Sequence, residues 1–141
     1  MPEFRSKRVL QLCFPARAAE LKRVRDAVRE SVEGCGCCAK STADIVLATD
    51  EACQNIIRHA YHGDSDNVIE LEVEHRGDSL VFSLTDQAPT IDPSRVKPRD
   101  LADIRPGGLG TYFIRRVMDE VEFLKPPSGR GNLLRMVRRI D

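Results

Sequence analysis

The chain has 141 residues, of which 41% are hydrophobic and 31% are charged, a composition typical of one globular domain rather than of a disordered segment. Lysine and arginine together number 22, as do aspartate and glutamate, so no net charge favours binding to nucleic acid or to a membrane surface. No apolar run is long enough to span a bilayer and the charged first residues do not form a secretory signal, so we expect one cytosolic domain over residues 1–141 that binds neither nucleic acid nor membrane.

The first half of the chain predicts one strand followed by two helices. Residues 9–14 form a short β-like run that a proline ends, which is typical of an edge strand because proline has no amide donor for the ladder. Residues 16–33 carry apolar side chains at steps of three and four, the period of an amphipathic helix. Ser41 and Asp44 resemble a capping box, which would open a second helix over about residues 42–61.

The second half predicts a hairpin, a long connection, a short helix and two closing strands. The expected elements are strands over residues 67–75, 79–85, 121–124 and 132–140 and a helix over residues 111–120. About residues 87–110 lack periodicity, and because a connection of this length is usually functional we expect a lid there. The order of elements predicts an α/β (α+β) fold: a two-layer sandwich with the helices on one face of a mixed β-sheet.

The second predicted helix carries polar residues along the border of its apolar face. The apolar stripe consists of Ile45, Ala48, Ala52 and Ile56. Glu51, Asn55 and His59 follow one another at four-residue intervals and form a second stripe beside it, where polar groups need partners. Periodicity alone favours a plainer interpretation, namely a solvated flank with helical ion pairs such as Asp50 with Arg58.

Three motifs stand in a fixed order along the chain. They occupy residues 51–61 (EACQNIIRHAY), 86–93 (DQAPTIDP) and 105–110 (RPGGLG). Together, in this order and at this chain length, they resemble the ATP-binding domain shared by gyrase-type ATPases and histidine kinases. Within that group the chain looks most like the small bacterial anti-sigma-factor serine kinases. The resemblance covers nearly the whole chain and implies the histidine-kinase-like ATPase fold.

The resemblance also implies a site for ATP and Mg²⁺. Asn55 would give its side-chain oxygen to Mg²⁺, a hard ion that prefers oxygen ligands. Glu51, one turn earlier, would be the catalytic general base, and Asp86 would accept the adenine amino group. The other residues that the resemblance assigns to nucleotide binding are His59, Ala88, Arg105, Gly107, Gly108, Leu109, Gly110, Thr111 and Asn132.

Several of these residues also have plainer interpretations when taken singly. Asp86 is a residue type that forms turns, and an arginine such as Arg105 is commonly solvated in a loop. The glycines before residue 111 would by themselves indicate only a flexible turn. In the proposed site their backbone amides would instead approach the phosphates at the start of a helix.

The sequence departs from the family pattern at two positions. Where the family usually has glycine two residues after the adenine-binding aspartate, this chain has Ala88, followed by Pro89, so we expect weakened or reshaped nucleotide binding rather than its loss. Near the end of the chain the family often carries a threonine pair after a glycine. Here Asn132 follows Gly131, and its side chain could offer a hydrogen bond in their place.

The five cysteines do not have the spacing of an extracellular disulfide framework, which predicts reduced thiols. Three of them, Cys35, Cys37 and Cys38, cluster outside the family motifs, and no second cysteine or histidine pair completes a zinc site. Cys13 and Cys53 lie on apolar faces, which predicts that they are small core residues.

The resemblance implies a serine/threonine protein kinase. Such a kinase would phosphorylate a serine of an anti-anti-sigma protein and would sequester a sigma factor when that partner is phosphorylated. A homodimer formed through the first strand or helix is also implied. Two alternatives stay open: a nucleotide-binding regulatory module without phosphotransfer, and a detached catalytic domain of a histidine kinase. The spacing from Glu51 to Asn55 and the small size favour the serine kinase.

Overall fold

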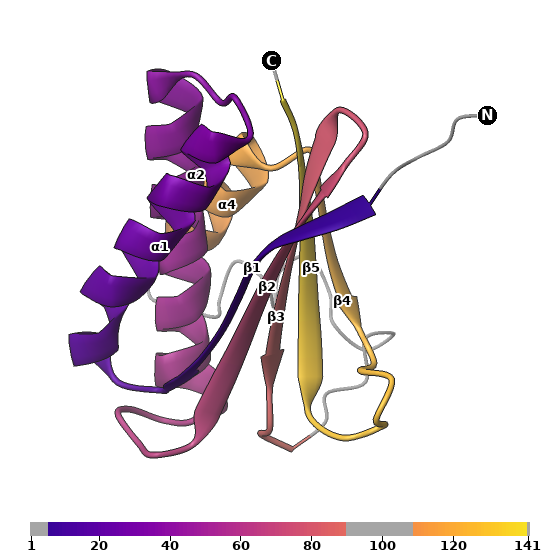
Figure 1. Cartoon of the computed structure of the whole chain (residues 1–141). Helices are drawn as coiled ribbons and strands as arrows, with labels where there is room; N and C mark the ends of the chain where they lie inside the picture. Colours follow the sequence, from indigo (N-terminus) through magenta and orange to yellow (C-terminus); the bar gives the residue numbers. More distant parts are fainter. Residues whose placement is uncertain (1–5, 90–108, 141) are drawn as a thin grey trace.

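A five-stranded β-sheet forms one layer of the fold, and the helices cover one of its faces (Figure 1). The computed structural model describes residues 6–89 and 109–140. The strands are β1 (Ser6–Pro15), β2 (Val68–Arg76), β3 (Ser79–Asp86), β4 (Glu120–Leu124) and β5 (Asn132–Arg139), in the order β1-β2-β3-β5-β4. This arrangement confirms the predicted α+β class with helices on one face of a sheet.

Every pairing between the described strands is antiparallel, so the expectation of a mixed sheet is wrong. A single crossover helix would return the chain to the end from which β1 started, and β2 would then run parallel to β1. Two long helices separate these strands instead, and the second brings the chain back along the sheet, as Figure 1 shows. β2 therefore runs opposite to β1, with Phe14 facing Ile69 and Leu12 facing Leu71.

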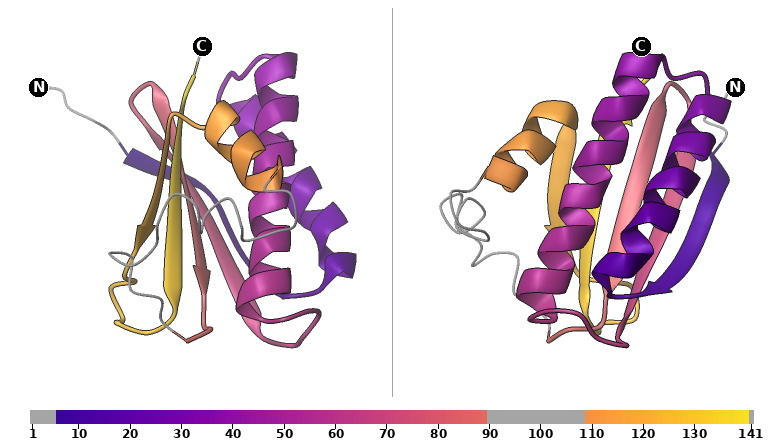
Figure 2. Two further views of the ribbon diagram at one scale, coloured as in Figure 1. Left: turned by 180° about the vertical axis from the view of Figure 1, so that it is seen from behind. Right: turned by 90° about the vertical axis from the view of Figure 1, so that its left-hand side faces the viewer.

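Two long helices and shorter helical segments pack against the sheet. They are the 3₁₀ turn η1 (Ala18–Glu20), α1 (Leu21–Gly34), α2 (Ala39–Asn55), the π-helical turn η2 (Ile56–Ala60) and α4 (Leu109–Val117). α2 lies between α1 and α4 (Figure 2). The apolar face predicted for α1 is confirmed by burial of Leu21, Val24, Val28 and Val32. Among the described residues, no helix is long and apolar enough to cross a bilayer.

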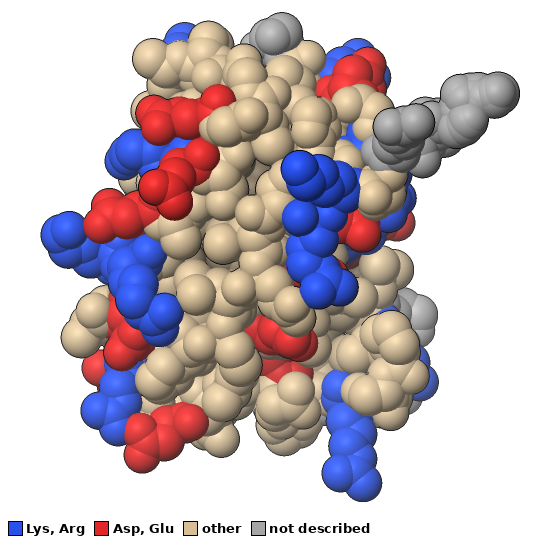
Figure 3. Space-filling view, viewed as in Figure 1, with Lys and Arg blue, Asp and Glu red and all other residues tan. Residues whose placement is uncertain are grey.

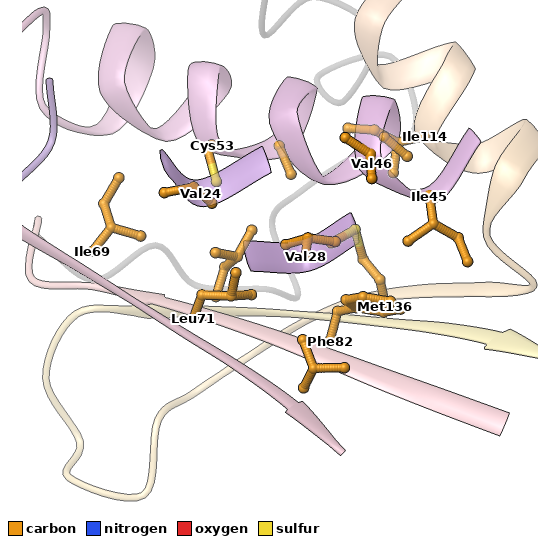
Figure 4. Close-up of a cluster of buried hydrophobic side chains, with 14 of the residues drawn as sticks. Val24, Val28, Ile45, Val46, Cys53, Ile69, Leu71, Phe82, Ile114 and Met136 are labelled. Carbon is orange, nitrogen blue, oxygen red and sulfur yellow. The ribbon is translucent and has the colours of Figure 1, made fainter. Parts of the chain in front are cut away.

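The hydrophobic core lies between the sheet and the helices (Figure 4). Alternate strand residues point into it, and the fully buried ones include Ile69, Leu71, Val73, Leu80, Phe82 and Met136. Burying one such side chain stabilises the fold by about 1.5–3 kcal/mol. On the face drawn in Figure 3, lysines and arginines lie among acidic residues, as their equal numbers predict.

α2 begins at Ala39 rather than near residue 42, and it has a different cap from the predicted one. Cys38 occupies the N-cap position in an extended conformation, and its sulfur accepts the N–H of Ser41 at 3.5 Å. Ser41 is buried in the first turn, where its hydroxyl accepts a hydrogen bond from the Arg138 guanidinium at 3.0 Å. Asp44 forms an ion pair with a lysine one turn earlier. The predicted capping box is therefore wrong. Ser41 lies inside the helix, and its hydroxyl accepts a hydrogen bond from Arg138 of β5.

The cysteines divide between the core and the surface. Cys53 is fully buried on α2, as predicted, and burial raises the pKa of its thiol. Cys13 is exposed, so its predicted core position is wrong. The adjacent Phe14 points into the core, and successive strand residues point to opposite faces, which leaves Cys13 on the outer face opposite Glu70. No disulfide bond joins any of the five cysteines, all of which lie among the described residues, and this part of the chain contains no cluster of metal-binding side chains.

Replacing Cys38 with serine tests the cap of α2. Serine is among the preferred N-cap residues, so Cys38→Ser should raise the free energy of unfolding by about 0.5–1 kcal/mol. Urea denaturation followed by circular dichroism measures this change. Cys13→Ser, the same substitution at an exposed strand position, is the matched control and should change stability by less than about 0.5 kcal/mol. A loss of stability in Cys38→Ser would contradict the assigned cap.

Candidate functional site

The C-terminal half of α2 carries the two side chains at the centre of the predicted site. Glu51 and Asn55 lie one helical turn apart, and both are half-buried. The Oδ1 atom of Asn55 is buried and has no hydrogen-bond partner among the described residues. Leaving a buried amide oxygen unpaired costs about 1–3 kcal/mol. A bound ion is one way to satisfy such an atom, and Mg²⁺ takes oxygen ligands, so Asn55 is compatible with the metal site predicted for it.

Directly after Asn55 the helix changes from α to π geometry. The Tyr61 N–H bonds to the carbonyl five residues earlier, at 3.0 Å, and His62 follows with a positive φ of 58°. π turns are rare in proteins, and those that occur are often found at functional sites. His59 lies in this turn and is exposed. Its role in nucleotide binding stays a prediction.

The end of β3 provides a buried carboxylate. Asp86 is 4% exposed, and its Oδ1 atom accepts the Ala88 N–H at 3.0 Å and the Asn132 side-chain amide at 2.9 Å. Burial raises the pKa of this carboxyl, and the hydrogen bonds from Asn132 and Ala88 oppose the rise. The Asn132 amide also donates to the Pro89 carbonyl at 3.2 Å. The structure thus brings three of the predicted residues together, while the role of Asn132 in nucleotide binding stays a prediction.

Alanine at position 88 is compatible with the backbone it occupies. Ala88 is buried, and its N–H closes a turn on the carboxylate of Asp86. Within the described residues, His62 is the only non-glycine residue with a positive φ, so Ala88 has a conformation open to any L-amino acid. The alanine therefore adds a methyl group beside the site but no backbone strain.

Gly131, immediately before β5, lies against the end of β3. Its φ is +79°, and a Cβ atom added there would lie 1.9 Å from the Asp86 carbonyl oxygen. No side chain fits at that distance, so glycine is required for this approach. Because Asn132 is the next residue, the same contact helps to place the Asn132 amide on the carboxylate.

Tyr61 connects the two parts of the site, although no pattern in the sequence predicts a role for it. Its hydroxyl donates to the Val68 carbonyl at 2.8 Å and accepts the Gln87 N–H at 2.6 Å. Burial raises the pKa of this hydroxyl, which therefore stays protonated and able to donate. The hydrogen-bond partners of Tyr61 lie in other segments, so the sequence does not reveal them. The one sequence feature that could have indicated its role is its position at the end of the motif that contains Glu51 and Asn55.

The glycine-rich segment before α4 lies mostly outside the described residues, as does most of the predicted lid. Three of the predicted residues fall there, namely Arg105, Gly107 and Gly108. Three others, Leu109, Gly110 and Thr111, form the start of α4. The helix thus begins slightly earlier than expected and follows the glycines directly, while the contacts of all six residues with a nucleotide stay predictions.

The sequence is similar to a known domain family over most of its length. The family model described as histidine kinase-like ATPase domain matches residues 14–138. The serine-protein kinase RsbW of Halalkalibacterium halodurans is 28% identical over 128 residues, which cover 85% of this chain and 77% of that protein. The serine-protein kinase RsbW of Staphylococcus aureus is 24% identical over 139 residues, which cover 92% of this chain and 87% of that protein.

Two solved structures have a similar fold. The RsbU and RsbW domains of Rv1364c from Mycobacterium tuberculosis superpose with a TM-score of 0.65 at 20% identity, covering 93% of this chain and 32% of that chain. The SiaB–SiaC complex from Pseudomonas aeruginosa superposes with a TM-score of 0.65 at 17% identity, covering 93% of this chain and 91% of that chain. At these identities the similarity shows the fold alone.

Alanine at Gly131 tests the contact between β5 and Asp86. Gly129→Ala is a matched control, because Gly129 has a φ of +78° and nothing within 4 Å of an added Cβ atom. An alanine at positive φ costs about 1–2 kcal/mol, which both variants should lose. Gly131→Ala should lose a further ~1–3 kcal/mol or more, because the backbone must move away from the methyl group. Urea denaturation measures both values, and equal losses would show that the close approach does not exist.

Proposed function

This chain belongs to the histidine kinase-like ATPase domain family, and on that basis we propose that it is a serine/threonine protein kinase that transfers the terminal phosphoryl group of ATP. The observation that carries the proposal is the buried, unpaired Oδ1 atom of Asn55, one helical turn from Glu51. Phosphoryl transfer mainly requires positioning and the neutralisation of charge. A metal ligand beside a carboxylate meets both requirements. The RsbW relatives, which are named serine-protein kinases, support the same activity.

Asn55 would hold Mg²⁺ through its Oδ1 atom. When bound, Mg²⁺ would neutralise negative charge on the phosphates. Ala52 and Ile56, close to Asn55 in the sequence, are buried. Their burial anchors the end of α2 to the core and would limit movement of the Asn55 amide. A ligand held in this way needs little reorganisation when the ion and the nucleotide arrive.

Glu51 would act as the general base. One turn of α-helix rises by about 5.4 Å, so the carboxylate lies beside the metal ligand rather than in its place. There it would accept the proton of a serine hydroxyl while the hydroxyl oxygen attacks the terminal phosphorus and ADP leaves. Its position near the surface, only half-buried, leaves room for a protein substrate to approach.

Asp86 would bind the adenine amino group at the other part of the site. The Ala88 N–H and the Asn132 amide both bond to one of its oxygens and hold the carboxylate in place. Because Ala88 adopts its conformation without strain, we expect nucleotide binding to persist in spite of the missing glycine.

The substrate would be a serine of an anti-anti-sigma protein, and the phosphorylation state of that partner would decide whether this kinase sequesters a sigma factor. The RsbW relatives support this assignment, and the SiaB–SiaC neighbour, solved as a complex, supports binding of a partner protein by this fold. We further propose that the kinase is a cytosolic homodimer. The alternatives are a nucleotide-binding module without phosphotransfer and a detached histidine kinase domain.

Asn55→Ala should weaken binding of ATP in the presence of Mg²⁺ by about 5- to 150-fold, because the loss of one buried ligand oxygen costs about 1–3 kcal/mol. Calorimetric titration with and without Mg²⁺ measures the effect, and the variant should lose most of the dependence on the metal. Leu47→Ala truncates a side chain that is 52% exposed on the same helix, so this control should bind like the wild-type chain. Wild-type affinity in Asn55→Ala would count decisively against the proposed metal site.

Glu51→Gln should keep the affinity for ATP but slow phosphoryl transfer by about 10²–10⁴-fold, the usual contribution of a general base. Labelled ATP and a candidate anti-anti-sigma protein provide the assay, and the product should survive acid as phosphoserine does. Glu33→Gln, the same substitution at an exposed position of α1, is the control and should transfer at the wild-type rate.

Three outcomes would reject parts of this proposal. Transfer by Glu51→Gln at the wild-type rate would remove the general base. An acid-labile product would identify a histidine kinase. Binding of ATP without transfer by the wild-type chain would favour the module that lacks phosphotransfer.

A further inference from the structure

Tyr61 occupies a place where the ladder between β2 and β3 would otherwise continue. Ile69 faces Asp86, so by the same register Val68 faces Gln87 one position further along. The next rung there would be a hydrogen bond from the Gln87 N–H to the Val68 carbonyl. The Tyr61 hydroxyl lies between these two groups instead. It accepts a hydrogen bond from the Gln87 N–H at 2.6 Å and donates one to the Val68 carbonyl at 2.8 Å. The hydroxyl thus separates the strands where the pairing ends.

This hydroxyl bridge also ties the Asp86 segment to the helix that carries the proposed metal ligand. Tyr61 follows η2 directly, and its N–H bonds back to the first residue of that turn at 3.0 Å. On the other side, Gln87 lies between Asp86 and Ala88, which are themselves joined by a hydrogen bond of 3.0 Å. One side chain therefore links the end of α2 to the segment that contains the buried carboxylate.

We infer that Tyr61 is a positioning residue that holds residues 86–88 at a set distance from α2 and thereby controls how strictly the site selects adenine. This inference rests on the proposed function, because it requires a nucleotide whose base lies at Asp86. Tyr61 acts through the Gln87 backbone. A phenylalanine would fill the space of the ring but would leave a gap the size of an oxygen atom between Gln87 and Val68. Because both groups are exposed, water would bond to them or they would bond to each other. Either change would remove the link that holds the Asp86 segment at a set distance from α2.

Tyr61→Phe in the full chain tests this role through equilibrium binding of Mg·ATP and Mg·GTP. The affinity for ATP should fall by about 2- to 12-fold, as expected when one ordinary, partly exposed hydrogen bond is lost. The affinity for GTP should fall less, because Asp86 favours adenine, so the preference for ATP shrinks. Tyr112→Phe is the matched control: this other tyrosine is 59% exposed, and its hydroxyl accepts a hydrogen bond from Arg116 on the same helix at 3.4 Å. It should bind both nucleotides like the wild-type chain.

Two results of the binding experiment would overturn the inference. One is an unchanged affinity of Tyr61→Phe for ATP. The other is an equal loss of affinity for ATP and GTP, which would indicate a general structural role and no control of base selection. Failure of the wild-type chain to bind either nucleotide would instead overturn the proposed function on which the inference rests.

Hydrogen exchange at the Gln87 amide tests the bridge without a variant or a nucleotide. In the wild-type chain this amide should exchange at least about 100-fold more slowly than in an unstructured peptide, because the Tyr61 oxygen holds its hydrogen. Exchange at the unprotected rate would overturn the inference, whether or not nucleotide binds and even if Tyr61→Phe fails to fold.

Discussion

The approach of Gly131 to the Asp86 carbonyl is the constraint on which the proposed base-binding part of the site depends. A Cβ atom at this position would lie 1.9 Å from that oxygen, so the beginning of β5 reaches the end of β3 only because the residue has no side chain. The contact brings Asn132 to the carboxylate, which is buried and needs hydrogen-bond donors. A close contact of the backbone thus makes possible an interaction between side chains.

The two ends of α2 are joined to the rest of the fold by polar contacts of different kinds. At its beginning, the Arg138 guanidinium bonds to the Ser41 hydroxyl at 3.0 Å and to the Val117 carbonyl at 2.7 Å, which links α2 to the end of α4. At its end, the π turn leads to Tyr61 and from there to Gln87. The helix that carries the proposed metal ligand is therefore anchored on both sides of the site, as preorganised binding requires.

Local patterns predicted much of this structure correctly. Apolar residues at helical spacing identified the buried face of α1, and alternation identified the strands of the β2–β3 hairpin. The motif residues Asp86, Ala88 and Asn132 do meet. A prediction failed where a distant residue intervened, because Ser41 resembled a cap but bonds to Arg138.

The sequence by itself determined which segments become helices and strands, because hydrophobic period and turn residues act within a few positions of each other. It also determined the family, since the motifs can be recognised without coordinates. Only the tertiary structure decided that the sheet is antiparallel, that Cys13 faces outward and that Tyr61 separates β2 from β3. These features depend on contacts between residues far apart in the chain. Such contacts produce no periodic pattern of residues in the sequence, so they cannot be predicted from it.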